Sequence, residues 1–363
     1  MILKRLKSRP ILKFTYESPD NELTQISVVM PIFNQALIIH DVLDCLTKCM
    51  TLSYELIIID DASEDSTLEI VIKTIKALIE RNTNCKSVRV YSFNSSVFET
   101  KCDSFGISVS KSKYILEIQA DMFIYERGFD RKLVRAAETY SDVLMISGRG
   151  VEQLVPISRA FVSSKGSNLR DGDSLRRYIG KRFRNQFQRA LNFKSRQVFI
   201  EVPSKFDFSG IPTDKYVLPS KIEFLTLGYT GRLGMSINEC YSDTSLRERS
   251  LYIGETVMRG PLLIRKDAYE FIGGFNTEGF FLGYDDHDLS ARALKFGFRV
   301  GFVPIGFQSP LFLGSSRKVR TIATEFQILR HLIRIRKNYH NTDLAALCNM
   351  FAEKLVNPEI RAF

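Results

Sequence analysis

Short apolar runs alternate with segments of helical periodicity along the first part of the chain. Four runs have strand length and are rich in apolar and β-branched residues: 26–33 (ISVVMPIF), 54–60 (YELIIID), 87–93 (SVRVYSF) and 114–121 (YILEIQAD). Three intervening segments have apolar residues at helical spacing: 36–49, 63–81 and 97–111. Strands and helices that alternate in this way predict an α/β fold, with a mostly parallel sheet and helices on both faces.

The rest of the chain adds segments to this predicted α/β core. The first 24 residues are basic and then polar, which is typical of a peripheral strand or a flexible arm. Beyond the last strand signals, the apolar spacing indicates helices. We divide the chain into an arm (1–24), a first core segment (25–150), an insertion (151–256), a second core segment (257–313) and C-terminal helices (314–363).

The insertion has an excess of basic residues. Between residues 159 and 196 there are eleven Lys and Arg against two Asp. The resulting surplus of nine positive charges nearly equals the formal charge of +10 of the whole chain. Apolar residues at every fourth position predict an amphipathic helix over 173–193, basic on its other faces. This helix lies either on an anionic membrane surface or on the core with its basic face in water. No aromatic stacking platform accompanies the charge, so nucleic acid is an unlikely partner.

Acidic residues follow two of the predicted strands. Asp60 and Asp61 end the second strand, and Asp121 ends the fourth. In parallel sheets ligands bind beyond the carboxyl ends of the strands, although Asp also opens turns and caps helices. The chain has no glycine-rich phosphate loop, so a divalent cation, Mn²⁺ or Mg²⁺, is expected to help hold phosphate groups.

A second acidic group opens a predicted helix near residue 285. The segment 283–289 (GYDDHDL) contains Asp285, Asp286 and Asp288, more acid than a helix cap requires. A carboxylate at a helix N-terminus stays ionised, which suits a general base. Asp288 is expected to stabilise the helix start or to pair with Arg292. His287 is expected to be exposed or to bond locally, because no second His or Cys stands at metal-ligand spacing.

Cysteines and apolar runs indicate a cytoplasmic protein. The six cysteines form no CxxC pair, which favours reduced, buried thiols. No apolar run approaches the roughly 20 residues that a membrane span needs, and the N-terminus lacks a signal-peptide core. We expect a soluble protein, or one that is peripheral on the inner face of a membrane.

Four blocks in order, ISVVMPIFN, ELIIIDDASEDST, YILEIQADM and residues 258–304, resemble the signatures of the family 2 inverting glycosyltransferases, which have the GT-A fold and use nucleotide sugars. The resemblance implies that Asp60 and Asp61 bind the nucleoside and that a turn from Pro31 to Asn34 walls the base pocket. It places Lys101 near the diphosphate.

The same resemblance identifies the remaining site residues. The DxD motif of the family falls on Gln119, Ala120 and Asp121, so Gln119 would contact the ribose and Asp121 would hold the metal. One acid of the motif is missing, which predicts a weakened cation site; Gln308, where many relatives have a metal-binding His, points the same way. On the acceptor side, Asp286 would be the base, with Asp285 as the second candidate for that role and as the residue that binds the acceptor. Gly260 and Pro261 would border the sugar and acceptor pocket.

These residues predict an inverting transfer of a sugar from a nucleoside-diphosphate sugar to a hydroxyl of a glycan or a lipid-linked glycan. Two alternatives stay open. The missing acid of the motif would suit a GT-A-like module that binds a nucleotide or glycan without turnover. A nucleotidyltransferase on a related sheet would need a glycine-rich basic loop, which PIFNQALI does not provide.

Overall fold

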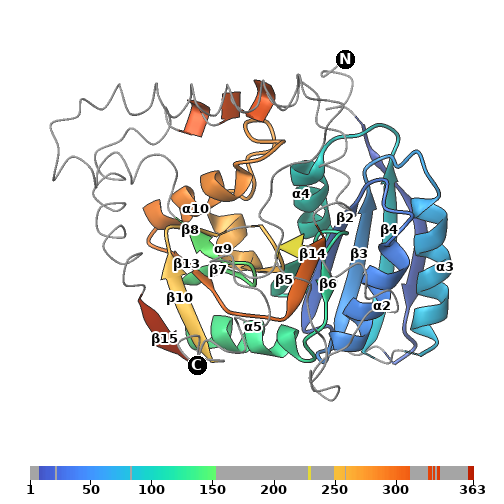
Figure 1. Cartoon of the computed structure of the whole chain (residues 1–363), viewed down its shortest axis with the longest axis horizontal. Coiled ribbons are helices and arrows are strands. Elements are labelled where there is room, and N and C mark those ends of the chain that lie inside the picture. The colour runs from blue at the N-terminus through green and yellow to red at the C-terminus, as the bar shows by residue number, and fades with distance from the viewer. Residues whose placement is uncertain are drawn as a thin grey trace, which may run out of the picture.

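A ten-stranded sheet organises the computed structural model (Figure 1). The structure describes residues 8–20, 23–81, 84–152, 228–229, 249–257, 259–310, 326–328, 330–331, 333–335 and 359–363. In sheet order the strands are β1 (Pro10–Glu17), β4 (Cys85–Phe93), β3 (Tyr54–Asp60), β2 (Ile26–Ile32), β5 (Tyr114–Glu117), β12 (Leu262–Arg265), β7 (Val143–Ser147), β13 (Arg299–Phe302), β10 (Ser250–Gly254) and β15 (Ile360–Ala362). Among these described strands, seven run in one direction, and β1, β12 and β10 run in the other.

The parallel strands β4, β3, β2 and β5 form the first half of the sheet. Every residue of β2 and β3 is buried, as the unbroken apolar run predicts for strands covered on both faces. The helices α2 (Ile39–Cys49), α3 (Thr67–Ile79) and α4 (Glu99–Val109) connect these strands. The predicted strand–helix order is therefore confirmed, although the fourth strand is shorter than predicted and ends at Glu117. The predicted peripheral strand is β1, antiparallel to β4 at the sheet edge.

The second half of the sheet joins the first through one antiparallel strand. β12 lies between β5 and β7 and is antiparallel to both. The helices α5 (Phe129–Thr139), α9 (Lys266–Phe271) and α10 (Asp285–Lys295) belong to this half. Residues just before β12 thus lie beside the carboxyl end of β5, because an antiparallel strand begins where its neighbour ends.

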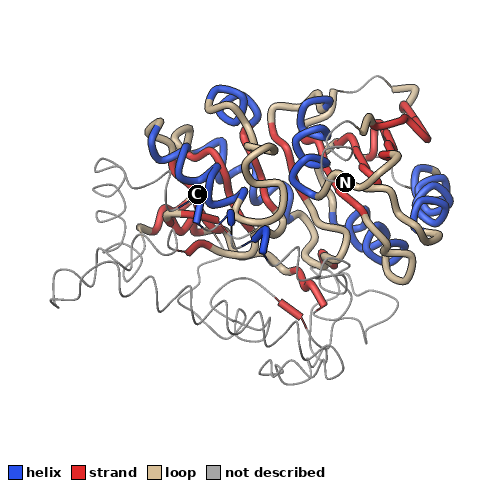
Figure 2. Tube along the Cα trace, turned by 90° about the horizontal axis from the view of Figure 1, so that it is seen from above, coloured by secondary structure: helices blue, strands red, loops and turns tan. Residues whose placement is uncertain are grey.

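Two apolar clusters cover the two faces of the sheet. On one face, α2, α3 and α5 pack on side chains such as Val28 and Ile58. On the other, α4, α9 and part of α10 pack on Val29 and Ile57. Figure 2 shows helices on both sides of the strand layer, as the sequence predicts. Successive residues of one strand thus pack into opposite apolar clusters, one on each face of the sheet.

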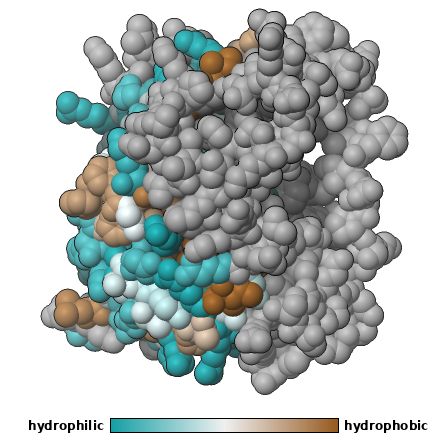
Figure 3. Space-filling model, turned by 90° about the vertical axis from the view of Figure 1, so that its left-hand side faces the viewer, coloured by the Kyte–Doolittle hydropathy of each residue, from teal (hydrophilic) through white to brown (hydrophobic). Residues whose placement is uncertain are grey.

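Smaller elements complete the described structure. β6 (Phe123–Ile124), β14 (Phe307–Pro310) and β9 (Gly228–Tyr229) form a three-stranded sheet, and β8 (Val151–Glu152) pairs with β11 (Thr256–Val257). Hydrophilic side chains are mixed with separate apolar ones on the described part of the face in Figure 3. The described helices include none with the length and apolar character of a membrane span. The predicted amphipathic helix at 173–193 lies outside the described residues.

Candidate active site

Asp61 fixes the loop that leads into α4. It follows β3 directly, and its carboxylate accepts hydrogen bonds from the Ser96 hydroxyl at 2.7 Å and from the amides of Val97 at 2.5 Å and Phe98 at 3.1 Å. Burial raises the pKa of Asp61 to about 6, although these hydrogen bonds lower it in part. Phe98 has a φ of 70°, a conformation uncommon for a bulky residue. The acid at this strand end therefore holds a strained turn at the start of α4.

Asp60 and Asn34 organise the neighbouring turns. The Asp60 carboxylate accepts hydrogen bonds from the amide of Ser63 at 3.0 Å and from the hydroxyl of Ser92 at 2.7 Å. Asn34, with a φ of 50°, donates its amide to the Ser63 hydroxyl at 3.0 Å, and its side-chain oxygen accepts from the amide of Glu64 at 2.8 Å. Both side chains thus hold the loops at the carboxyl ends of β2 and β3, where the sequence predicts the nucleoside.

The other predicted donor-side residues lie at the same edge of the sheet. Pro31 is buried in β2, and Lys101 is half-buried in the first turn of α4. Asp121 is 7% exposed in the turn after β5. In that turn Gln119 donates its side-chain amide to Glu99, the first residue of α4. The strand register places Gln308 of β14 beside Phe123, close in sequence to Asp121.

Arg259 is surrounded by acids from both halves of the sheet. Its guanidinium donates to the carboxylates of Asp103 and Asp285. The Nη2 atom also lies 3.2 Å from Glu117 Oε1 and 3.7 Å from Glu99 Oε1. Glu99 and Asp103 belong to α4, Glu117 to β5 and Asp285 to α10, so one side chain joins three elements. We call these five residues the Arg259 cluster.

Burial raises the pKa of three acids of the Arg259 cluster: Asp103, Glu117 and Asp285. The side chains of Asp103 and Glu117 are fully buried, and burial raises the pKa of Asp103 to about 7 and that of Glu117 well above its ordinary value, although Arg259 opposes the shift. Burial also raises the pKa of Asp285 to about 6, again opposed by Arg259. One guanidinium is thus not enough to keep all of these carboxyls fully ionised at neutral pH.

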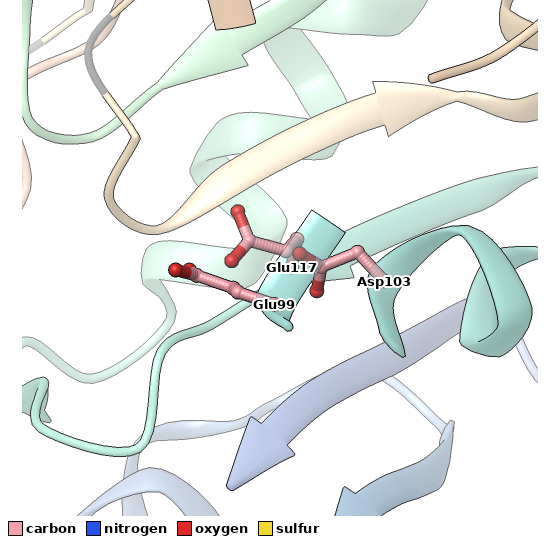
Figure 4. A group of neighbouring side chains, drawn as sticks. All are labelled: Glu99, Asp103 and Glu117. Atoms are coloured by element: carbon pink, nitrogen blue, oxygen red, sulfur yellow. The ribbon is translucent and has the colours of Figure 1, made fainter. Parts of the chain in front are cut away.

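Three carboxylates of this cluster have the spacing of a metal site. Ligand oxygens of Glu99, Asp103 and Glu117 lie within 4.8 Å of one another (Figure 4), so the three side chains could hold a metal ion. The guanidinium of Arg259 is within 4.0 Å of all three and already supplies a positive charge there. A resident ion fits this position poorly while Arg259 stays in place. Asp121, the implied metal ligand, is not a member of this group.

The acids of α10 have distinct partners. Asp286 Oδ1 accepts hydrogen bonds from the amide and ring Nδ1 of His287, each at 2.8 Å. Burial acts to raise the pKa of Asp286, but the charges of His287 and Arg259 and these hydrogen bonds outweigh it and lower the pKa. Asp288 Oδ2 pairs with Arg292 at 2.8 Å, in agreement with the predicted i+4 pair. His287 bonds locally, as predicted.

Gly260 and Pro261 hold the approach to β12. A Cβ on Gly260 would lie 2.5 Å from Cβ of Arg149, so only glycine fits at this position without displacing the neighbour. The carbonyl of Pro261 accepts a hydrogen bond from the amide of Gly148 at 2.7 Å. Both residues therefore hold the segment that carries Arg259 against the end of β7.

The loop before α10 reaches both the donor side and a C-terminal segment. The ring of Phe281 lies 5.2 Å from that of Phe98, centroid to centroid. His331, 1% exposed, lies with its Nδ1 atom 3.0 Å from the carbonyl of Leu282. This contact places His331 in the packing of the loop before α10.

The structure brings a few of the predicted residues into one network. Hydrogen bonds and ion pairs run from Gln119 through Glu99 and Arg259 to Asp285, joining the predicted donor side to the acids of α10. Asp61 contacts this network through the Val97–Phe98 turn at the start of α4. Asp60 is directed to the adjacent turns instead, since its hydrogen bonds go to Ser63 and Ser92.

Sequence reasoning missed four residues of the Arg259 cluster. Glu117 interrupts an apolar strand, and Glu99 and Asp103 are four apart on one helix. An acid within a buried strand signals a buried cation, because an isolated charge there is costly. That signal was present, but it did not identify Arg259 as the partner.

Three comparisons with known proteins bear on this site. Residues 27–198 match the family model described as "Glycosyl transferase family 2". No curated protein sequence matches the chain.

Solved structures are similar to this chain in part of their architecture. S. aureus TarS 1–349 in complex with UDP-GlcNAc is 10% identical, with 92% of this chain and 73% of that chain covered and a TM-score of 0.49. The mannosyltransferase PcManGT from Pyrobaculum calidifontis, in complex with GDP-Man and Mn²⁺, is 13% identical, with 98% and 81% covered and a TM-score of 0.43. Similarity at this level does not extend the ligands of those proteins to this chain.

Proposed function

We propose that this chain moves a sugar from a nucleoside-diphosphate sugar to a hydroxyl of a glycan or lipid-linked glycan, with inversion at the anomeric carbon. The chain is a glycosyltransferase, and its residues 27–198 match the glycosyl transferase family 2 model. The observation that best supports this proposal is the network from Gln119 to Asp285. It joins the strand ends suited to a nucleotide to a helix start that presents a carboxylate.

The donor would bind at the carboxyl ends of β2, β3 and β5. Asp60 and Asp61 would hold the nucleoside, with the Pro31 to Asn34 turn as a wall. Asp61 supports this role because it is already positioned by three hydrogen bonds and stands beside the Phe98 turn. Lys101 lies in the first turn of α4. Its positive charge and the partial positive charge of the helix N-terminus would both attract the diphosphate.

A divalent cation, Mn²⁺ or Mg²⁺, would be held by Asp121 and by phosphate oxygens of the donor. It would neutralise negative charge on the diphosphate leaving group. A single carboxylate beside Gln119 predicts weak binding of the ion, so the activity should need millimolar rather than micromolar metal. In this arrangement Gln119 would bond the ribose through its side chain, which now contacts Glu99.

Asp286 would be the base that deprotonates the acceptor. Its Oδ1 atom is engaged by His287, whereas Oδ2 accepts no hydrogen bond from the described residues. Its lowered pKa keeps the carboxylate ionised at neutral pH. The acceptor oxygen would bond to the anomeric carbon as its proton passes to Asp286 and the nucleoside diphosphate departs. Asp285, Gly260 and Pro261 would border the acceptor.

The test of this proposal is transfer by the purified chain. We expect nucleotide release from one member of a panel of UDP-, GDP- and dTDP-sugars with Mn²⁺, and a loss of activity on addition of EDTA. Asp286→Asn should lower turnover by about 10²- to 10⁴-fold and leave donor affinity nearly unchanged, because it removes only the base.

The matched control is Glu270→Gln, which changes an exposed acid on α9 and should keep full activity. Unchanged turnover in Asp286→Asn would remove the assignment of the base. Donor binding without release by the wild-type chain would instead indicate a binding module.

We also propose that 173–193 attaches the enzyme to the inner face of an anionic membrane. The support is the basic, amphipathic sequence of that segment. Deletion of 173–193 should reduce sedimentation with liposomes that contain phosphatidylserine. Equal sedimentation of the two forms would exclude this role.

A further inference from the structure

We infer that Arg259 is a positioning residue, which ties Asp285 and the first turn of α10 to the donor half of the domain and so sets the place of the neighbouring Asp286. The inference rests on the proposed function for the role of Asp286. Its structural part, the tie between α4, β5 and α10, does not depend on that function.

The two edges of the guanidinium contact different elements. Nη1 donates to Asp285 of α10, and Nη2 donates to Asp103 of α4 and lies 3.2 Å from Glu117 of β5. The Arg259 side chain is 10% exposed, and those of Asp103 and Glu117 are fully buried. A planar group with donors on two edges can bridge such partners, whereas the single ammonium of lysine cannot reach both sides at once.

Neighbouring groups hold the guanidinium in this orientation. Its carbon lies 5.4 Å from the centroid of the Phe275 ring. The backbone carbonyl of Arg259 accepts a hydrogen bond from Arg149 Nη1 at 2.8 Å. Gly260 allows this close approach of Arg149. The side chain is therefore fixed at both ends and transmits the position of the donor half to α10.

The start of α10 depends on this tie. Tyr284, the residue before the helix, has a φ of 64° and provides no side-chain cap, and Gly283 before it has a φ of 76°. Such a start is normally stabilised by a capping side chain. Here the Arg259–Asp285 ion pair provides a tertiary restraint on the first turn. Asp286 follows Asp285 directly, so a displaced first turn would displace the carboxylate that faces the acceptor.

The link also reaches the donor. Glu99 Oε1 lies 3.7 Å from Arg259 Nη2 and accepts the side-chain amide of Gln119. A donor that engages Gln119 therefore acts on the same network that positions Asp285. Coupling of this kind predicts that Arg259 affects the chemical step more than the affinity for the donor.

The test needs a variant that folds. Arg259→Met alone would leave buried acids without a cation, so we combine it with Asp103→Asn and Glu117→Gln, which remove two of those acids. The double variant Asp103→Asn/Glu117→Gln, with Arg259 retained, is the matched control. Both should show cooperative thermal unfolding.

We expect kcat of the triple variant to be about tenfold or more below that of the double variant. A displacement of a catalytic group by about 1 Å can slow the chemical step by about 10²-fold. The donor KM should stay within about twofold of the control. Arg259→Lys in the double-variant background should recover only part of the loss. Equal kcat values for the triple and double variants would overturn the catalytic part of the inference.

Hydrogen exchange measured by mass spectrometry tests the positioning itself without any need for turnover. We expect faster exchange of the amides at 284–290 in the triple variant than in the double variant, with 54–60 unchanged. If exchange at 284–290 is the same in both, Arg259 does not position α10. A wild-type chain that releases no nucleotide from any donor would refute the proposed function, whereas the exchange result would still decide the role of Arg259.

Discussion

The strand-end acids of the donor half and the acids of the Arg259 cluster are held in different ways. Asp60 and Asp61 accept hydrogen bonds from neutral groups, the hydroxyls and backbone amides of nearby residues. Asp103, Glu117 and Asp285 instead depend on the charge of one residue, Arg259, from another part of the chain. The strand ends of the donor half thus support their own geometry, whereas the Arg259 cluster, which spans both halves of the sheet, is assembled by long-range ion pairs.

This difference has an energetic consequence. Hydrogen bonds from several neutral donors share the stabilisation of a carboxylate, so the loss of one donor leaves others in place. A buried cluster that shares one cation has no such reserve, because every acid in it loses its counter-charge together. The Arg259 cluster should therefore be the more fragile region of the site.

The largest expected effect comes from Arg259→Met without compensating changes. It leaves buried acids unpaired and should reduce the free energy of unfolding by about 3–5 kcal/mol, measured by urea denaturation. The acids can limit this loss by binding protons, so the variant should be less destabilised at pH 5 than at pH 8. A loss below about 1 kcal/mol at pH 8 would show that the cluster does not depend on this charge.

A smaller loss is expected for Asp61→Ala on the donor side. The amides of Val97 and Phe98 and the Ser96 hydroxyl would lose their acceptor, which should cost about 1–3 kcal/mol in urea denaturation. The exchange of amides at 97–101 should rise, and that at 284–290 should rise less, because Asp103 and Glu117 still hold Arg259. Ser96→Ala, which leaves both amides paired, is the matched control with a smaller loss. A rise at 284–290 equal to that at 97–101 would contradict the local support of the strand-end acids.

The last prediction concerns the dependence of stability on pH. Burial raises the pKa of Asp103 to about 7 and those of Asp61 and Asp285 to about 6, above the ordinary value of 3.8. The folded protein therefore binds more protons than the unfolded chain between about pH 4 and 7. These groups stabilise the fold at low pH, and this contribution is lost as the pH rises through about 6 to 7.

Thermal melts at pH 5, 6, 7 and 8 measure this dependence. Each group contributes up to about 1.4 kcal/mol per pH unit within its window. Asp103→Asn should flatten the dependence up to about pH 7, and Asp61→Asn should flatten it only up to about pH 6. The lowered pKa of Asp286 has the opposite sign and acts below pH 4, outside this range. A melting temperature that rises steadily from pH 5 to pH 8 would contradict the raised pKa values.

The sequence by itself determined the core of the fold and placed a group of acids at one edge of the sheet. Unbroken apolar runs of strand length predict strands covered on both faces, and their alternation with helices predicts parallel pairing. Acids that follow such strands lie at one edge of the sheet. For this reason Asp60, Asp61 and Asp121 could be placed from local patterns, and the i+4 pair of Asp288 with Arg292 from helix geometry, whereas Gln119 came only from the resemblance to the family.

Only the tertiary structure decided how the two sides meet. Arg259 and Glu117 are far apart in the sequence, and their contact depends on the insertion of antiparallel β12 beside β5. No local period encodes that pairing. The partner of a buried charge is set by which strands become neighbours, and this follows from packing over the whole chain. For the same reason Asp60 accepts a hydrogen bond from nearby Ser63, whereas Asp285, with a similar local sequence, forms an ion pair with Arg259, which is distant in the sequence.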